Sequence, residues 1–181
     1  MEPSSRLLGP RLMRARWLSA WMGIWFASLQ AGYFLCLETS LTATYLTYVL
    51  VVACWLVGAM VGLAIAWDSH HRLMLLALVS YAVVTWLAHA APSDRVWPAA
   101  VIGMVVGGIV SGQFFAMRQG LFPHVGWLFF WENTGFLIGW TVVMAGWMLF
   151  GEGILWWVPG LSGGCAFITS RLGFGQALAR C

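Results

Sequence analysis

Six long apolar stretches alternate with short polar breaks along the 181-residue chain. A membrane-spanning α-helix needs about 20 mostly apolar residues, and each stretch is close to that length. Helices are the expected form, because backbone groups in lipid must be hydrogen-bonded within their own segment. We therefore predict six helices, at residues 17–37, 43–67, 73–91, 98–117, 127–150 and 153–170.

Little of the chain lies outside these stretches. The pattern predicts an all-α, polytopic membrane protein whose six transmembrane helices form one compact bundle over residues 17–170. A basic segment, residues 1–16, precedes the bundle, and a tail, residues 171–181, follows it. Gly173 and Gly175 are expected to form a flexible exit from the last helix.

The composition supports a lipid environment. The chain is 61% hydrophobic and 8% charged, whereas soluble domains carry roughly a quarter charged residues. All nine cationic residues are arginines, and the formal net charge is only +3. Because the arginines form neither a basic helix nor a basic domain, we expect the lipid bilayer as a partner and no nucleic acid.

The distribution of arginine predicts the orientation. If the N-terminus is inside, eight of the nine arginines lie on the inner side, and Arg95 alone lies outside. Positive loops favour the cytoplasmic side, so we expect an inner (plasma) membrane protein with both termini cytoplasmic. The eight inner arginines are Arg6, Arg11, Arg14, Arg16, Arg72, Arg118, Arg171 and Arg180.

Small residues recur at a spacing of four on several predicted helices. Such stripes allow close approach of helix backbones in a membrane, where packing replaces the hydrophobic driving force. Helix-packing roles are therefore predicted for Gly58, Gly62, Gly103, Gly107, Gly135 and Gly139. A second stripe on the fourth helix has Gly108 and Gly112, and the first helix has Ser19, Gly23, Ala27 and Ala31. Val143 is expected to face lipid.

Glu132 is the sharpest polar feature, because it lies inside the fifth predicted helix on the face of Gly135 and Gly139. A charged side chain inside a membrane costs at least ~2.5 kcal/mol and needs a partner or a proton. Arg118, at the inner end of the fourth helix, lies at a compatible depth. Two interpretations remain open: an ion or proton site, and a structural ion pair or hydrogen-bonded acid.

Four further polar residues complete the candidate polar interior. They are Gln30, Glu38, Gln113 and Asn133. Gln30, Gln113 and Asn133 lie within predicted helices, and Glu38 closes the first one. Hydrogen bonds between helices explain the three amides, and the lining of a substrate path is the second interpretation.

The histidines and the catalytic motifs point away from cofactor chemistry. A haem between helices needs two histidines at one depth, and His70, His71, His89 and His124 offer no such pair. These residues are expected to lie solvated in loops or at helix ends, with no metal or other cofactor. A nucleophile elbow, a metalloprotease motif and a P-loop are all missing from the sequence, so we do not expect an enzyme.

Two stretches resemble the membrane-embedded region of spermidine synthase-like multi-pass proteins, which itself looks like part of a major facilitator bundle. The first stretch runs from Gly32 through Glu38 to Gly62, and the second is Trp131 to Gly139, with its Asn-Thr-x-Gly pattern. Asp68 and Arg72 are spaced like the facilitator motif between helices 2 and 3, where an acid and a base pin neighbouring helices at the inner face.

The resemblance implies a bundle like half of a twelve-helix facilitator. The arginine that often follows the acid of helix 1 in that family is absent, and so is the soluble aminopropyltransferase domain, so that activity is not carried over. The first hypothesis is a half-transporter-like module for a small solute or ion, made of three-helix repeats and working as a homo-oligomer or with a partner. The alternative is a non-catalytic anchoring subunit of a larger membrane complex of the electron-transfer or photosynthetic type.

Overall fold

The computed structural model describes residues 5–41, 45–65, 70–90 and 96–178, with side chains described within 12–39, 45–65, 70–90 and 96–171. These residues form α-helices and two short 3₁₀ turns, and no strand occurs among them. The helices are α1 (Ser5–Leu41), α2 (Tyr45–Ala64), α3 (His70–Ala90), α4 (Val96–Arg118), α5 (Val125–Phe150) and α6 (Ile154–Leu178). The turns are η1 (Gln119–Leu121) and η2 (Gly151–Gly153).

The predicted helices are present, and the terminal ones are longer than predicted. Helix α1 begins at Ser5, so most of the basic segment is helical. Its 37 residues correspond to about 55 Å at 1.5 Å per residue. Helix α6 continues to Leu178, and the flexible exit at Gly173 and Gly175 is therefore a wrong prediction. A glycine costs a helix only about 1 kcal/mol, which does not stop a long helix.

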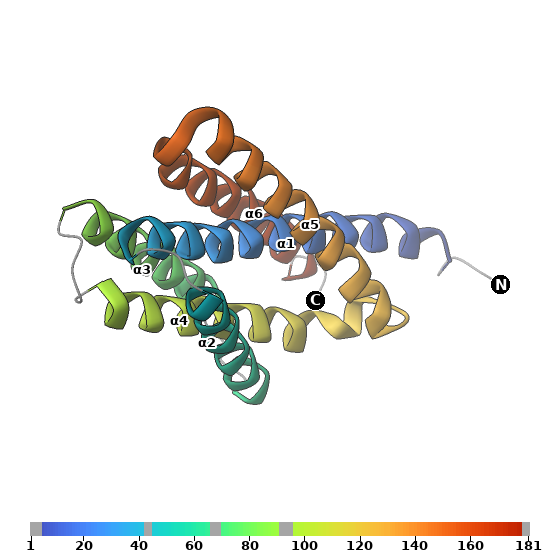
Figure 1. Ribbon diagram of the computed structural model, residues 1–181. Coiled ribbons are helices and arrows are strands. Elements are labelled where there is room, and N and C mark those ends of the chain that lie inside the picture. Colours follow the sequence, from blue (N-terminus) through green and yellow to red (C-terminus); the bar gives the residue numbers. More distant parts are fainter. Residues whose placement is uncertain (1–4, 42–44, 66–69, 91–95, 179–181) are drawn as a thin grey trace.

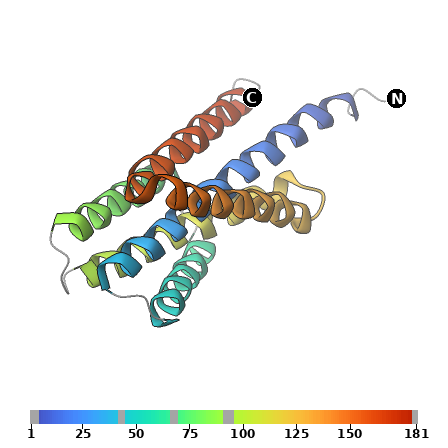
Figure 2. The ribbon, with the colours of Figure 1, turned by 45° about the horizontal axis from the view of Figure 1, so that its top comes forward.

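The glycine turn between α5 and α6 matches its predicted polar break. Gly151 has a φ angle of +62°, a left-handed backbone conformation that glycine adopts without steric cost. The turn reverses the chain within three residues, so α6 starts next to the end of α5, and the two helices diverge from the turn (Figure 2).

Helix α1 is the central helix of the bundle. Its apolar span is 72% buried, against 28% for α2 and 33% for α3. Figure 1 shows α1 running between the pair α5 and α6 on one side and the pair α2 and α4 on the other. Its N-terminal end projects past the other helices (Figure 1).

Two close helix contacts organise the bundle, one between α1 and α5 and one between α2 and α4. In each contact, glycines of one helix lie against the backbone of the other, as the small-residue stripes predict. We call them the α1–α5 seam and the α2–α4 seam. The α1–α5 seam consists of Ala20, Gly23, Ala27, Glu132, Gly135 and Gly139, and the α2–α4 seam of Gly58, Ala59, Gly62, Gly108 and Gly112.

The two glycine stripes of α4 have different neighbours. A Cβ atom added at Gly108 or Gly112 would overlap the backbone of α2. Gly103 and Gly107 are buried as predicted, but they make room for aromatic rings: Gly103 lies against the Tyr33 ring and Gly107 against the Trp55 ring. The stripe that brings the backbones of α2 and α4 together is therefore Gly108 and Gly112.

Val143 was expected to face lipid, and that expectation is wrong. Its side chain is 1% exposed and packs in a cluster with Ala31, Leu35 and Leu155. It lies four residues beyond Gly139 and so continues the buried face of α5. Val142, the preceding residue, is 48% exposed.

Large apolar side chains cover the outside of the bundle. Leu46 and Met60 on α2 and Leu137 and Met148 on α5 are between 69% and 85% exposed. Five stretches among the described residues are long and apolar enough to cross a membrane, and the fifth contains both α5 and α6. An apolar surface of this extent is stable in lipid and unstable in water.

The chain begins and ends on the same side of the bundle. Figure 2 shows the start of α1 and the end of α6 pointing in the same direction, with the two helices running antiparallel.

Candidate functional site

Glu132 lies inside the α1–α5 seam. It shares the buried face of α5 with Leu128, Gly135 and Gly139, and the residue is 7% exposed. Across the seam, a Cβ atom at Gly23 would overlap the backbone oxygen of Glu132. The predicted burial of this acid among helices is therefore confirmed, and its role in transport or ion binding stays a prediction.

Arg118 and Glu132 do not form an ion pair in the described structure. Arg118 is the last residue of α4, and the helix ends there because Gln119 to Leu121 turn the chain towards α5. Glu132 lies two turns into α5, against α1. The compatible depth inferred from the sequence therefore does not place the two groups in contact.

The candidate amides of the polar interior occupy three different environments. Gln113 is 1% exposed, and its Nε2 donates a 3.4 Å hydrogen bond to the backbone oxygen of Ile65. Gln30 is half-buried on α1. Asn133 is exposed, and its Nδ2 donates to the backbone oxygen of Phe129 on its own helix. Its predicted interior position is wrong, since one residue along a helix rotates the side chain by about 100°.

The remaining predicted site residues lie at the ends of helices. Glu38 is half-buried in the last turn of α1. Arg72 is exposed in the first turn of α3, and Asp68, its predicted partner, lies outside the described residues.

The first turn of α3 carries two histidines that are less solvated than expected. His70 is 4% exposed, and its Nδ1 has no hydrogen-bond partner among the described residues. His71 Nε2 lies 3.1 Å from the Ser170 hydroxyl of α6. Both are helix residues, because α3 begins at His70, and the prediction of solvated loop residues is wrong for His70. No group of three metal-ligating side chains occurs within the described part of the chain.

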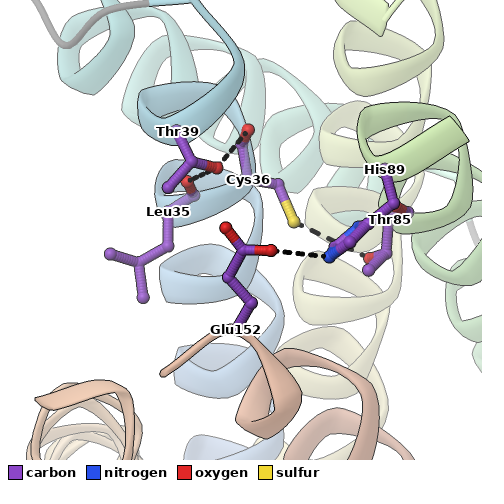
Figure 3. Close-up of polar contacts among 6 residues, drawn as sticks. All are labelled: Leu35, Cys36, Thr39, Thr85, His89 and Glu152. Carbon is purple, nitrogen blue, oxygen red and sulfur yellow. Dashed lines mark hydrogen bonds and ion pairs between the residues drawn. The ribbon is translucent and has the colours of Figure 1, made fainter. Parts of the chain in front are cut away.

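Where α3 ends, a polar contact joins distant parts of the chain (Figure 3). His89, in the last turn of α3, has its Nε2 3.1 Å from Glu152 Oε2 in the α5–α6 turn. Its Nδ1 lies 2.7 Å from the backbone oxygen of Thr85. The His89 ring also packs against the Trp156 ring, with 5.4 Å between their centroids.

The geometry of His89 fixes its hydrogen bonds. A carbonyl oxygen only accepts, so Nδ1–H donates to Thr85, and Nε2 then meets a carboxyl oxygen that also has lone pairs. A hydrogen bond at this second contact requires one further proton, held either by the imidazole or by the carboxyl group. The contact thus joins α3 to the α5–α6 turn through a proton-bearing pair.

The hydroxyls below this pair extend the polar cluster into the bundle. The Cys36 thiol donates to Thr85 Oγ1 at 3.8 Å, which joins α1 to α3. The Thr85 hydroxyl itself donates to the backbone oxygen of Tyr81, and the Thr39 hydroxyl to that of Leu35. Figure 3 shows Cys36, Thr85, His89 and Glu152 pointing towards one another from three elements.

The His89–Glu152 pair does not follow from the sequence pattern, which suggests a solvated position for His89 at a helix end and a polar break at Glu152. One signal could have revealed the pair: both residues lie at breaks between helices that an up-and-down bundle brings to one side, in a chain with only six acidic residues and four histidines. A histidine and a carboxylic acid that lie on one side of such a chain are natural partners.

The fold and the surface thus define a multi-pass helical membrane protein, with a buried acid near one end and a histidine–glutamate pair at the other. No protein-family model matches the sequence, and no similar curated protein or solved structure was found. The resemblance to the membrane region of spermidine synthase-like proteins therefore stays an expectation.

Proposed function

We propose that the protein is a six-crossing module of the inner membrane that works like half of a transporter for a small solute or ion. The observation that carries this proposal is the repeated packing of the bundle. If the chain is divided into α1–α3 and α4–α6, the middle helix of each half packs on the first helix of the other half.

The equivalence extends beyond the two seams. The first helix of each half also packs against the last helix of the other half, α1 on α6 and α4 on α3. Internal repeats of this kind are common in membrane transporters, whose transport motion moves one bundle against another. Since this chain supplies one bundle, we propose that it functions as a homodimer or with a second membrane subunit.

The proposed orientation places both termini in the cytoplasm. The eight-to-one distribution of arginine and the common direction of the chain ends (Figure 2) support it. Reporter fusions after Gly120 and after Arg180 are expected to report a cytoplasmic location, and a fusion after Ser93 a periplasmic one. A periplasmic reporter at the C-terminal end would contradict six crossings.

Within this module, Glu132 is the proposed solute- or proton-coupled group. It is the acid buried in a seam between helices that run the length of the bundle. Ionisable side chains inside membrane segments are rare, and they mark substrate, ion and proton pathways.

The test combines assembly state and flux. Native mass spectrometry of the protein in lipid nanodiscs is expected to detect two bundles, either two copies or one copy with a second membrane subunit. Flux of protons, alone or driven by a solute, is then measured in proteoliposomes that contain a pH-sensitive dye, for the parent protein and for Glu132→Gln. We expect Glu132→Gln to abolish flux while the assembly persists. A chain that is monomeric in nanodiscs would count against the half-transporter.

An anchoring subunit of a larger membrane complex is the second candidate. It is favoured by hydrogen bonds that join the helices to one another inside the bundle. The Ser28 and Ser162 hydroxyls join α1 to α6 at 2.9 Å, and the Tyr81 hydroxyl of α3 donates to the backbone oxygen of Leu155 in α6 at 2.9 Å. Such a subunit would tolerate Glu132→Gln in every assay and would lose its partners when the seams are disrupted.

A further inference from the structure

Arg16 is held against two tryptophans where the projecting part of α1 meets the start of α5. Its guanidinium carbon lies 5.5 Å from the centroid of the Trp127 ring and 5.7 Å from that of Trp131. The two rings are four residues apart on α5, so they occupy one helix face. Cation–π contact attracts the guanidinium electrostatically and leaves its positive charge in place.

The charge of Arg16 is not neutralised within the described structure. No carboxylate of the described residues lies within ion-pair distance of it. Its Nε atom is inaccessible to solvent and has no hydrogen-bond acceptor among those residues. A buried donor without an acceptor is costly. Arg16 as a whole is only half-buried, and its terminal guanidinium nitrogens are not among the buried donors without a partner, so an acceptor from outside the chain would meet the guanidinium there.

A hollow lies beside the same tryptophan. It has a volume of about 360 Å³ and is lined by His124, Gly126, Trp127 and Phe130. The His124 side chain makes no capping hydrogen bond at the start of this 26-residue helix, although the Trp127 N–H donates to the His124 backbone oxygen. The positive end of the helix dipole adds to the charge of Arg16.

We propose that Arg16, Trp127, Trp131 and this hollow bind the phosphate group of an anionic phospholipid. The orientation proposed above determines only which leaflet supplies the lipid, namely the cytoplasmic one; the binding site itself does not depend on it. Arginine and helix N–H groups supply the hydrogen bonds that phosphate accepts. Trp127 and Phe130 are 45% and 56% exposed, and their rings form apolar walls that can contact the glycerol and acyl part of a lipid. Inorganic phosphate has no apolar part and would gain nothing from these walls.

The test measures lipid retention by native mass spectrometry of the detergent-purified protein. Phosphatidylglycerol, phosphatidylcholine and inorganic phosphate are added separately at equal concentration. We expect the parent to retain phosphatidylglycerol in preference to phosphatidylcholine. Because one arginine near a membrane surface contributes about 1 kcal/mol to anionic lipid binding, Arg16→Gln is expected to reduce this preference about fivefold.

Arg72→Gln is the matched control, since it removes an equal charge from an exposed position at the start of α3. It is expected to retain the parental preference. Trp127→Leu keeps the charge and removes one ring and one wall of the hollow, so it is expected to weaken retention even if Arg16→Gln does not fold. Equal losses in Arg16→Gln and Arg72→Gln, an unaffected Trp127→Leu, or inorganic phosphate bound as strongly as the lipid would each overturn the proposal.

Discussion

The α1–α5 seam and the α2–α4 seam achieve the same close approach with different side chains. In both, glycines lie against the backbone of the facing helix. The α1–α5 seam contains Glu132, whereas the glycines of the α2–α4 seam meet backbone atoms of Trp55, Ala59, Val105 and Ile109, and no acidic residue is among these contacts. Close packing in this fold therefore needs no acid. It follows that the presence of Glu132 has to be explained by something other than helix association.

The largest expected effect comes from adding one methyl group where backbones touch. In Gly108→Ala and Gly135→Ala, the new Cβ would overlap the backbone of Trp55 or of Ala20. Overpacking of this kind costs typically 1–3 kcal/mol, and backbone atoms cannot rotate away. Both variants should unfold at lower temperature than the parent, by similar amounts, in a detergent melting assay.

Gly160→Ala is the matched control on α6. A Cβ atom there meets nothing within 4 Å, and alanine is the better helix former by roughly 0.5–1 kcal/mol. Gly160→Ala should therefore melt at or above the parental temperature. If all three variants melted alike, the seams would not be the contacts that hold the bundle together.

A smaller effect is expected one residue away from the α2–α4 seam. At Gly107, a Cβ atom would lie 2.7 Å from Cζ3 of the Trp55 side chain. An indole ring can shift where a backbone cannot, so Gly107→Ala should destabilise the protein less than Gly108→Ala. The same melting assay on this adjacent pair separates side-chain contact from backbone contact, and the reverse order would show that Trp55 is the more rigid neighbour.

The comparison also shows what the sequence could predict. Apolar length predicted the helices, and four-residue glycine spacing predicted that Gly58, Gly62, Gly135 and Gly139 are buried. Spacing alone did not distinguish Gly103 and Gly107, which face rings, from Gly108 and Gly112, which face a backbone. That distinction depends on where Tyr33 and Trp55 lie, and only the three-dimensional packing determines it.

Polar residues were harder to place for a related physical reason. Helical periodicity predicted the buried face of Glu132, because a single helix determines it. The partner of a polar group depends on how two helices cross, and so neither the separation of Glu132 from Arg118 nor the contact of His89 with Glu152 followed from their order along the chain. The lipid-facing position expected for Val143 is wrong because Val143 lies four residues after Gly139 and therefore on the same buried face of α5.

The smallest effect on stability is expected at the acid of the α1–α5 seam. Glu132→Gln changes the shape of the side chain very little and removes its ability to ionise. Because the described residues hold no ion pair between Glu132 and Arg118, the substitution leaves no partner charge unpaired. Melting of Glu132→Gln should stay within about 1 kcal/mol of the parent, and the double variant with Arg118→Gln should show additive effects. A non-additive result would restore the Glu132–Arg118 pair as a structural element. Additivity combined with lost flux would assign Glu132 to function, as the acid-free α2–α4 seam suggests.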